Sequence, residues 1–326
     1  MNIANPIYDA VFKYLMEDKE SARILISTII EKEIISLELS PKEKVYRIEA
    51  GDEKPPMAVY RLDFAARIKT ETGFQTILIE IQKAKYAADI MRFRRYLGSQ
   101  YRDKNNSYPV EYKWAGEIRK KRKAIPILTI YFLGYELEHT DVPIIKVERN
   151  YYDNRTGRKI NVKEEFIEAL THDSYVIQIP YLTDEVQTET ERLLSVFNQK
   201  TATDSGHILT INEFNYPDKY RRIIRRLMRA ASEEEIRDNM DLEDDYLEEL
   251  YDLERALGES KKTLKEKEEA LGEKDKVLGE KEKALGEKNK IIEEQDEKLG
   301  DKDKELGDKD KLIEEQKRII EALQEK

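Results

Sequence analysis

Residues 58–83, AVYRLDFAARIKTETGFQTILIEIQK, constrain the fold most, because acidic side chains occur there inside otherwise apolar stretches. Successive side chains of a β-strand point to opposite faces. With that period, Phe64 shares a face with other apolar residues and Asp63 lies on the other face. In the second half, Ile79 and Glu80 divide in the same way. The pattern predicts two strands, each with one apolar and one mixed face.

The segment TETG at 70–73 predicts a hairpin turn between these strands, because Gly73 can adopt a positive φ. A hairpin centred on this turn sets Asp63 opposite Glu80, and Arg61 opposite Gln82. A shift of one residue would mix apolar and polar faces, which disfavours it.

Two like charges directly opposed on neighbouring strands destabilise a sheet, and a divalent cation between Asp63 and Glu80 would remove that cost. The alternative is a half-solvated face, on which Asp63 pairs with an arginine and Glu80 with Lys83 or water. The chain has no cysteine and only three scattered histidines. Any metal bound by carboxylates would therefore be a hard ion, Mg²⁺ or Mn²⁺.

Two predicted helices add candidate site residues. The helix following the second strand has an apolar stripe over 86–101, and its neighbouring face could return Arg92 and Tyr96 to the same cleft. Solvation of Arg92 and packing of Tyr96 are the alternatives. Near the N-terminus, Asn5-Pro6 predicts a helix start that sets Asp9 and Lys13 four residues apart, which is also the spacing of an ordinary ion pair.

Charge is unevenly distributed in a chain of net charge −10. Residues 84–133 contain twelve Lys and Arg against four Asp and Glu, whereas 232–256 contain two against twelve. The basic run RKKRK at 119–123 indicates either a solvated loop or contact with a phosphate backbone. The apolar run 124–135 predicts a buried central strand. No signal peptide or membrane span is evident, so we expect a cytoplasmic protein without membrane contact.

From residue 257 one aliphatic side chain recurs every seven residues, in units such as ALGEKDK. The positions are Leu257, Leu264, Leu271, Leu278, Leu285, Ile292, Leu299, Leu306, Ile313 and Ile320. The position before each is less regular: it is alanine three times, threonine, lysine and glutamate once each, and a larger aliphatic residue four times. Glycines in a helix interior cost about 1 kcal/mol each. We therefore expect a long charged helix that could form a homo-oligomer, or alternatively a solvated low-complexity tail.

Four segments together resemble the PD-(D/E)XK nuclease family transposases, relatives of the recombination-promoting nucleases. They are NPIYDAVFKYLM, the aspartate of YRLDF, the strand ILIEIQ and the helix MRFRRY. The likeness covers roughly the first 100 residues, and more loosely the chain to about 230. It implies a restriction-endonuclease-like α/β core, with a mixed sheet flanked by helices. We divide the chain into a nuclease-like domain (1–200), a helical region (201–256) and a heptad-repeat tail (257–326).

The resemblance implies metal-dependent cleavage of DNA in recombination. Asp63 and Glu80 would hold the metal with the backbone carbonyl of Ile81, and Asp9 and Lys13 would support catalysis. The residues implied in DNA contact are Arg92, Arg95, Tyr96, Lys120, Lys121 and Arg122. Gln82 stands where many such nucleases have lysine; it can orient water but brings no charge. The alternatives are a weak or inactive DNA-binding protein on this fold, and an assembly protein acting through its tail.

Overall fold

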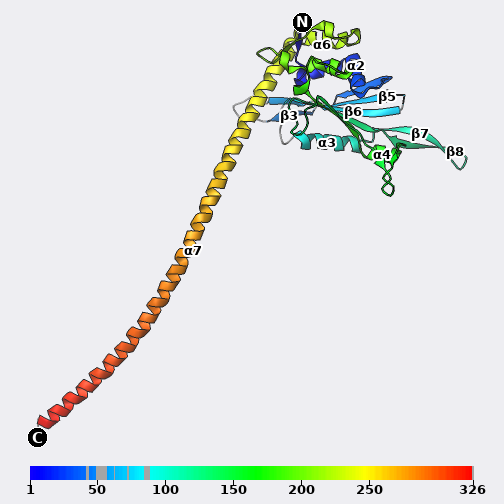
Figure 1. Cartoon of the computed structure of the whole chain (residues 1–326). Helices are drawn as coiled ribbons and strands as arrows, with labels where there is room; N and C mark the ends of the chain where they lie inside the picture. The colour runs from blue at the N-terminus through cyan, green and yellow to red at the C-terminus, as the bar shows by residue number, and fades with distance from the viewer. Residues whose placement is uncertain (42–43, 49–56, 62, 72, 84–88, 325–326) are drawn as a thin grey trace. The chain divides into compact units, whose positions relative to one another are not determined.

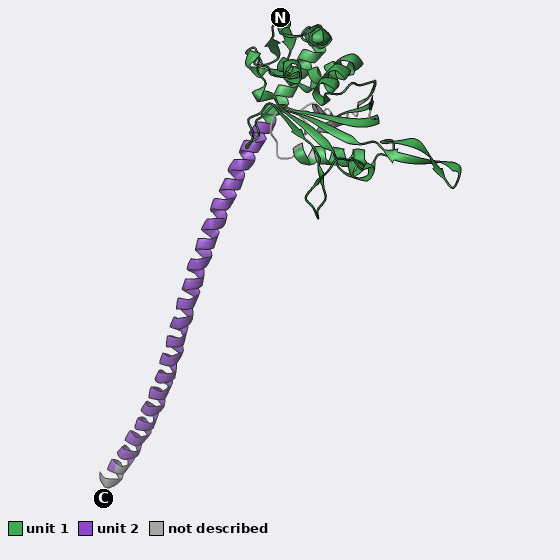
Figure 2. Cartoon of the chain, turned by 45° about the vertical axis from the view of Figure 1, so that its right-hand side comes forward, with its two compact units in different colours: residues 1–249 green, residues 250–326 purple. Residues whose placement is uncertain are grey.

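The structure, a computed structural model, describes residues 1–41, 44–48, 57–61, 63–71, 73–83 and 89–324. It contains two compact units, Met1–Glu249 and Leu250–Lys326 (Figure 2).

The first unit is built on a six-stranded mixed sheet (Figure 1). From edge to edge its strands are β10 (Ile144–Val147), β13 (Asp173–Gln178), β9 (Ile127–Leu133), β6 (Gly73–Gln82), β5 (Asp63–Thr70) and β2 (Ser36–Pro41). The pairs β13–β9 and β9–β6 are parallel, and the other three are antiparallel. The predicted α/β class with a mixed sheet is confirmed. The 124–135 run contains the predicted buried central strand, β9, which is limited to Ile127–Leu133.

Among the described residues, four further pairs of strands lie outside this sheet. They are β1 (Asn2–Ala4) with β14 (Ile208–Thr210), β3 (Lys44–Ile48) with β4 (Met57–Arg61), β7 (Ser107–Trp114) with β8 (Glu117–Ala124), and β11 (Tyr151–Tyr152) with β12 (Lys159–Ile160). Arg61 pairs with Lys44 in the β3–β4 pair, and the described β5–β6 ladder begins at Asp63 and Glu80.

Helices cover both faces of the sheet. They are α1 (Asp9–Glu17), α2 (Lys19–Ile30), α3 (Asp89–Arg102), α4 (Glu165–Leu170), α5 (Glu189–Leu194), α6 (Arg221–Ala230) and α7 (Glu234–Gln324). The larger core cluster joins α1, α2, α6 and the first turns of α7 to the sheet face that carries Phe64, Ile79 and Phe132. This core extends along the chain as far as Met240, so the residues after 200 complete it.

The other sheet face packs on α3 in a smaller cluster. Ala65 of β5 and Leu78 of β6 meet Phe93 and Tyr96 of α3 there. Residues alternate between the two clusters along β5 and β6, as the period-two pattern predicts.

The N-terminal helix begins later than the sequence suggests. Asn5 is not its N-cap; α1 starts at Asp9, after Tyr8. The Asn5 side chain instead donates to Gln199 Oε1 at 2.8 Å and to the Gly206 carbonyl at 2.7 Å. A buried amide makes the hydrogen bonds that its tertiary surroundings offer, and here these lie about 200 residues away in sequence.

The basic run at 119–123 is strand β8 rather than a loop. Ala115 (φ 51°) and Gly116 (φ 85°) form the two-residue connection between β7 and β8. Positive φ at both central residues suits the twist of a tight hairpin. The run therefore belongs to a paired, regular ribbon.

In the second unit, residues 250–324 continue α7 as an uninterrupted helix, which confirms the helical prediction for the tail. The recurring aliphatic side chains from Leu257 to Ile320 are exposed. Spaced ion pairs such as Lys265–Glu269, at 3.9 Å, follow the helix. In the described part of the chain, no helix is both long and apolar enough to cross a membrane.

Candidate functional site

The β5–β6 hairpin has the register that the sequence predicts. Asp63 pairs with Glu80, and Phe64 pairs with Ile79. Gly73 begins β6 with a φ of 127°, so the turn uses the conformational freedom of glycine. The side chains of Asp63 and Arg92 lie outside the described residues, so for these two positions the backbone alone is placed.

Glu80 is buried, with 2% of its surface exposed, on the face that α3 covers. Tyr131 is its partner on β9, and the Tyr131 ring lies 4.5 Å from that of Phe93. Burial raises the pKa of Tyr131 to about 12. The hydrogen bond with Thr129 lowers this pKa, and the negative charge of Glu80 raises it further. The carboxylate thus lies in a poorly hydrated setting, where electrostatic interactions are strong.

Gln82 follows Glu80 on the same face and ends β6. Its Oε1 accepts a hydrogen bond from the Tyr135 hydroxyl at 3.1 Å, and its backbone carbonyl accepts from the Gly134 N–H at 2.7 Å. A Cβ at Gly134 would lie 2.3 Å from the Lys83 carbonyl oxygen, so only glycine permits this approach. The end of β9 therefore fixes the end of β6 and the Gln82 amide.

Lys83 is engaged away from Gln82. Its ammonium lies 3.4 Å from the centroid of the Tyr8 ring and donates to Asp244 Oδ1. The adjacent lysine is therefore a poor substitute for a lysine at position 82, as expected from its place on the opposite strand face.

Asp244, in the first turns of α7, is the centre of a cluster with Tyr8, Lys83 and His207, here called the Asp244 cluster. Its Oδ2 accepts from the Tyr8 hydroxyl and contacts His207 Nε2, each at 2.8 Å. Burial tends to raise the pKa of Asp244, but the bonds from Lys83, His207 and Tyr8 outweigh it and lower that pKa. Burial, followed by the bond to Asp244, raises the pKa of Tyr8.

The preceding residue, Glu243, receives the N-terminus of α1. Its Oε2 accepts the Asp9 backbone N–H at 3.0 Å. Burial, followed by the charge of Asp9, raises the pKa of Glu243 well above its usual range. Since α1 packs on the Ile79 face, Asp9 and Lys13 come from the layer opposite α3.

The residues implied in DNA contact lie in different surroundings. Tyr96 is buried against Phe93 and Leu78. It therefore packs in the core, which was the alternative to a place in the cleft. Arg95 is exposed on α3. Lys120, Lys121 and Arg122 are exposed on β8.

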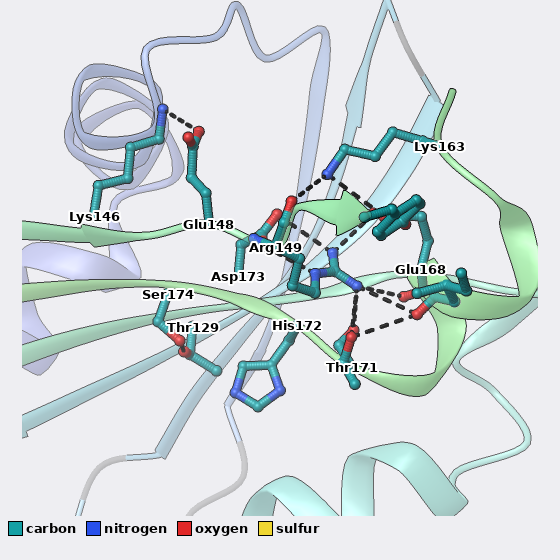
Figure 3. Close-up of polar contacts among 12 residues, drawn as sticks. Thr129, Lys146, Glu148, Arg149, Lys163, Glu168, Thr171, His172, Asp173 and Ser174 are labelled. Atoms are coloured by element: carbon teal, nitrogen blue, oxygen red, sulfur yellow. Dashed lines mark hydrogen bonds and ion pairs between the residues drawn. The ribbon is translucent and has the colours of Figure 1, made fainter. Parts of the chain in front are cut away.

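A second polar cluster surrounds Arg149 (Figure 3). Its guanidinium binds Asp173 Oδ1 and Glu168 Oε2, each at 2.8 Å, and donates to the Thr171 carbonyl at 2.8 Å. Tyr151 also donates to Glu168. Arg149 thus holds the carboxyl end of α4 and the start of β13 together. Its positive charge is also favourable beside the C-terminus of a helix. We therefore interpret this cluster as structural.

Among the described residues, no group of three or more His, Cys, Asp and Glu could hold a metal ion. A pocket of about 380 Å³ lies elsewhere, between β10 and the segment after β13, and is lined by residues such as Ile144, Leu182 and Glu191. Glu191 accepts from the Gln187 and Thr188 N–H groups and so caps α5.

Comparison with protein-family models, with curated proteins and with solved structures found no match.

Sequence reasoning missed the Asp244 cluster. The available signals were an acidic stretch at 232–256 and an isolated histidine at 207. Neither has a periodicity that could link it to Tyr8 or Lys83, because only tertiary packing brings them together.

Proposed function

We propose that the protein is a metal-dependent DNA endonuclease of the PD-(D/E)XK type, acting in recombination. The observation that carries this proposal is the register that sets Asp63 opposite Glu80, with Gln82 two residues further on the same strand face. This is the spacing of two carboxylates and an amide that the resemblance implies.

The candidate ligands are oxygen atoms, which hard cations prefer. Asp63 and Glu80 would hold Mg²⁺ or Mn²⁺ with the backbone carbonyl of Ile81, and water would complete the ligand set. Glu80 is buried, and a bound divalent cation would stabilise its carboxylate there. A bound divalent cation would supply Lewis acidity at the phosphate and make a bound water more acidic.

The chain's own groups would orient the reactants. The Tyr135 hydroxyl engages Gln82 Oε1, which leaves the amide nitrogen as a donor toward water. Arg92, Arg95 and the basic residues of β8 would neutralise phosphates. Asp9 and Lys13 belong to α1, on the other face of the sheet, and would support the site indirectly.

The test is cleavage of supercoiled plasmid with Mg²⁺, with Mn²⁺ and with chelator. We expect cleavage only with metal, and its loss in Asp63→Ala and Glu80→Ala. Glu71→Ala is the matched control, because Glu71 is an exposed carboxylate in the turn of the same hairpin. Parental activity in both site variants would refute the assignment.

Metal titration by calorimetry distinguishes a nuclease from an inactive DNA-binding protein on the same fold. A parent that binds Mg²⁺ but cuts none of several DNA substrates would be a DNA-binding protein on a nuclease fold. Gln82→Ala should slow cleavage with little loss of metal affinity, since the proposed partner of Gln82 is the water.

A second candidate function, assembly, has one specific observation in its favour. The second unit exposes an aliphatic side chain every seventh residue. Against a strong coiled coil, the positions three and four residues further on are mostly charged, for example Lys267 and Glu268 after Leu264. Light scattering of the full chain and of residues 1–256 tests whether the tail associates.

A further inference from the structure

The β7–β8 ribbon has two chemically different faces. Residues paired across an antiparallel ladder share a face, and successive residues alternate. One face, here called the aromatic face, carries Tyr108, Val110, Tyr112, Trp114, Glu117, Arg119, Lys121 and Lys123. The opposite face carries Ser107, Pro109, Glu111, Lys113, Ile118, Lys120, Arg122 and Ala124.

The base of the ribbon is attached to the first unit by side-chain contacts. Tyr108 packs against Phe74 with ring centroids 5.2 Å apart. Lys123 pairs with Glu165 of α4 at 3.2 Å. On the opposite face, the Arg122 guanidinium donates to the carbonyl of Lys104, which lies between α3 and β7, at 3.4 Å. These contacts hold the ribbon as an arm that projects from the sheet (Figures 1 and 2).

The outer part of the aromatic face exposes large rings beside cations. Trp114 is 61% exposed and Tyr112 is 37% exposed. Arg119 is the cross-strand partner of Tyr112, and the Lys121 ammonium lies 5.8 Å from the centroid of the Tyr112 ring. Arg119 also meets Glu117 at 3.4 Å, but an exposed ion pair of this kind contributes little and can exchange for another anion.

We propose that the aromatic face binds unpaired nucleotides of a nucleic acid strand. Tyr112 has Arg119 and Lys121 beside it, whereas Trp114 pairs across the ladder with Glu117. Exposed rings on a face that also carries these cations suit bases that stack and phosphates that pair with the charges. Tyr112 and Trp114 are two residues apart on one strand, about 7 Å, whereas bases in a duplex lie about 3.4 Å apart. The rings therefore match bases separated from one another rather than the edge of a paired stack.

The local charge is complementary to such a strand. Residues 107–124 contain six Lys and Arg against two Glu, in a chain whose net charge is −10. Binding to the ribbon needs no metal and no cleavage, so it goes beyond the proposed nuclease function and can be measured in chelator.

The test uses Trp114 as its own reporter, since it is the only tryptophan of the chain. The full-length protein is titrated, in chelator, with an oligo(dT) of about 15 nucleotides, near the upper limit of known single-strand site sizes. We expect the Trp114 emission to be quenched on binding, and a duplex of equal length to bind more weakly. This measurement requires no substitution, so it does not depend on the folding of a variant.

Paired variants then separate the two faces at equal charge. Anisotropy of a labelled oligo(dT) should show a loss of affinity of about fivefold or more for Tyr112→Ala, the lower limit for one stacked base. The double variant Arg119→Ala/Lys121→Ala should also bind more weakly, with a salt slope reduced by about 1.4 for two lost single-strand phosphate contacts. Lys113→Glu changes the charge by the same two units on the opposite face and should stay within about twofold of the parent in affinity.

Several results would overturn the proposal. Equal losses in Arg119→Ala/Lys121→Ala and in Lys113→Glu would mean attraction by overall charge alone. Binding seen by anisotropy without change in Trp114 emission would place the strand elsewhere on the protein. Preference for the duplex would reject unpaired nucleotides, and a Trp114 emission change with protein concentration alone would identify a second copy of the chain as the occupant.

Discussion

The ammonium of Lys83, at the end of the central strand β6, donates to Asp244 Oδ1, which lies 161 residues further along the chain. Tyr8 and His207 engage the other oxygen of the same carboxylate. This contact joins the N-terminal segment, the sheet, the β14 region and the first turns of α7.

Replacing Asp244 with alanine should destabilise the first unit by about 1–3 kcal/mol, because partly buried donors would lose their common acceptor. Chemical denaturation followed by circular dichroism measures this change. Asp245→Ala is the control, since the neighbouring side chain is exposed. Equal effects of both substitutions would show that the Asp244 cluster adds nothing beyond helix propensity.

Gly134→Ala should destabilise the protein by about 1–3 kcal/mol, because the added methyl group would collide with the Lys83 carbonyl. The same change should weaken metal binding at Glu80, since the ends of β6 and β9 would move apart. Gly98→Ala, with nothing within 4 Å of the added carbon, should be neutral or slightly stabilising in α3. Thermal melts of both variants measure these changes. An unchanged midpoint for Gly134→Ala would contradict the close approach of Gly134 to the Lys83 carbonyl.

The stability of the α2–α6 contact should depend on pH through Asp18. Hydrogen bonds from Arg222, at 2.9 and 2.6 Å, hold the pKa of Asp18 well below its usual value of 3.8. A lowered pKa means that this stabilisation is complete above the unfolded-state value and is lost as the pH falls below about 3.8.

Asp18→Asn tests that dependence without removing the helix cap, because asparagine caps as well as aspartate. Unfolding free energies measured from pH 7 down to pH 2 should show a lower value at pH 7 and a flatter decline in acid. Asp218→Asn, in an exposed pair with Arg221, should leave the profile unchanged. A parental profile for Asp18→Asn would refute the linkage.

Without metal, Asp63→Ala should be as stable as the parent or slightly more stable, because opposed carboxylates repel each other. Added Mg²⁺ should raise the thermal midpoint of the parent but not of the variant. The shift is read by differential scanning fluorimetry, with Glu71→Ala as control. A Mg²⁺ shift retained in Asp63→Ala would remove this residue from the site.

Truncation after Ala256 should leave the thermal midpoint of the remaining chain almost unchanged. The first compact unit ends at Glu249, and the recurring aliphatic side chains of the tail are exposed. Circular dichroism should lose helical signal in proportion to the residues removed. A large fall in the midpoint would mean that the tail stabilises the core.

Local patterns determined the parts of the fold that depend on neighbours in sequence. The period-two alternation and Gly73 fixed the register of Asp63 against Glu80, because a one-residue slip would have exchanged the buried and polar faces. The apolar run at 124–135 predicted a buried strand, and the charged heptads indicated a helix, with a solvated tail as the alternative.

Contacts between distant segments were decided only by the tertiary structure. Asn5 became a partner of Gln199 rather than a helix cap, and the basic run became a strand because β7 pairs with it. The Asp244 cluster combines residues 8, 83, 207 and 244, which no sequence period relates. Periodicity shows which face of an element is apolar, but the partner of a polar side chain depends on which elements pack together, and that is settled by burial of the whole core.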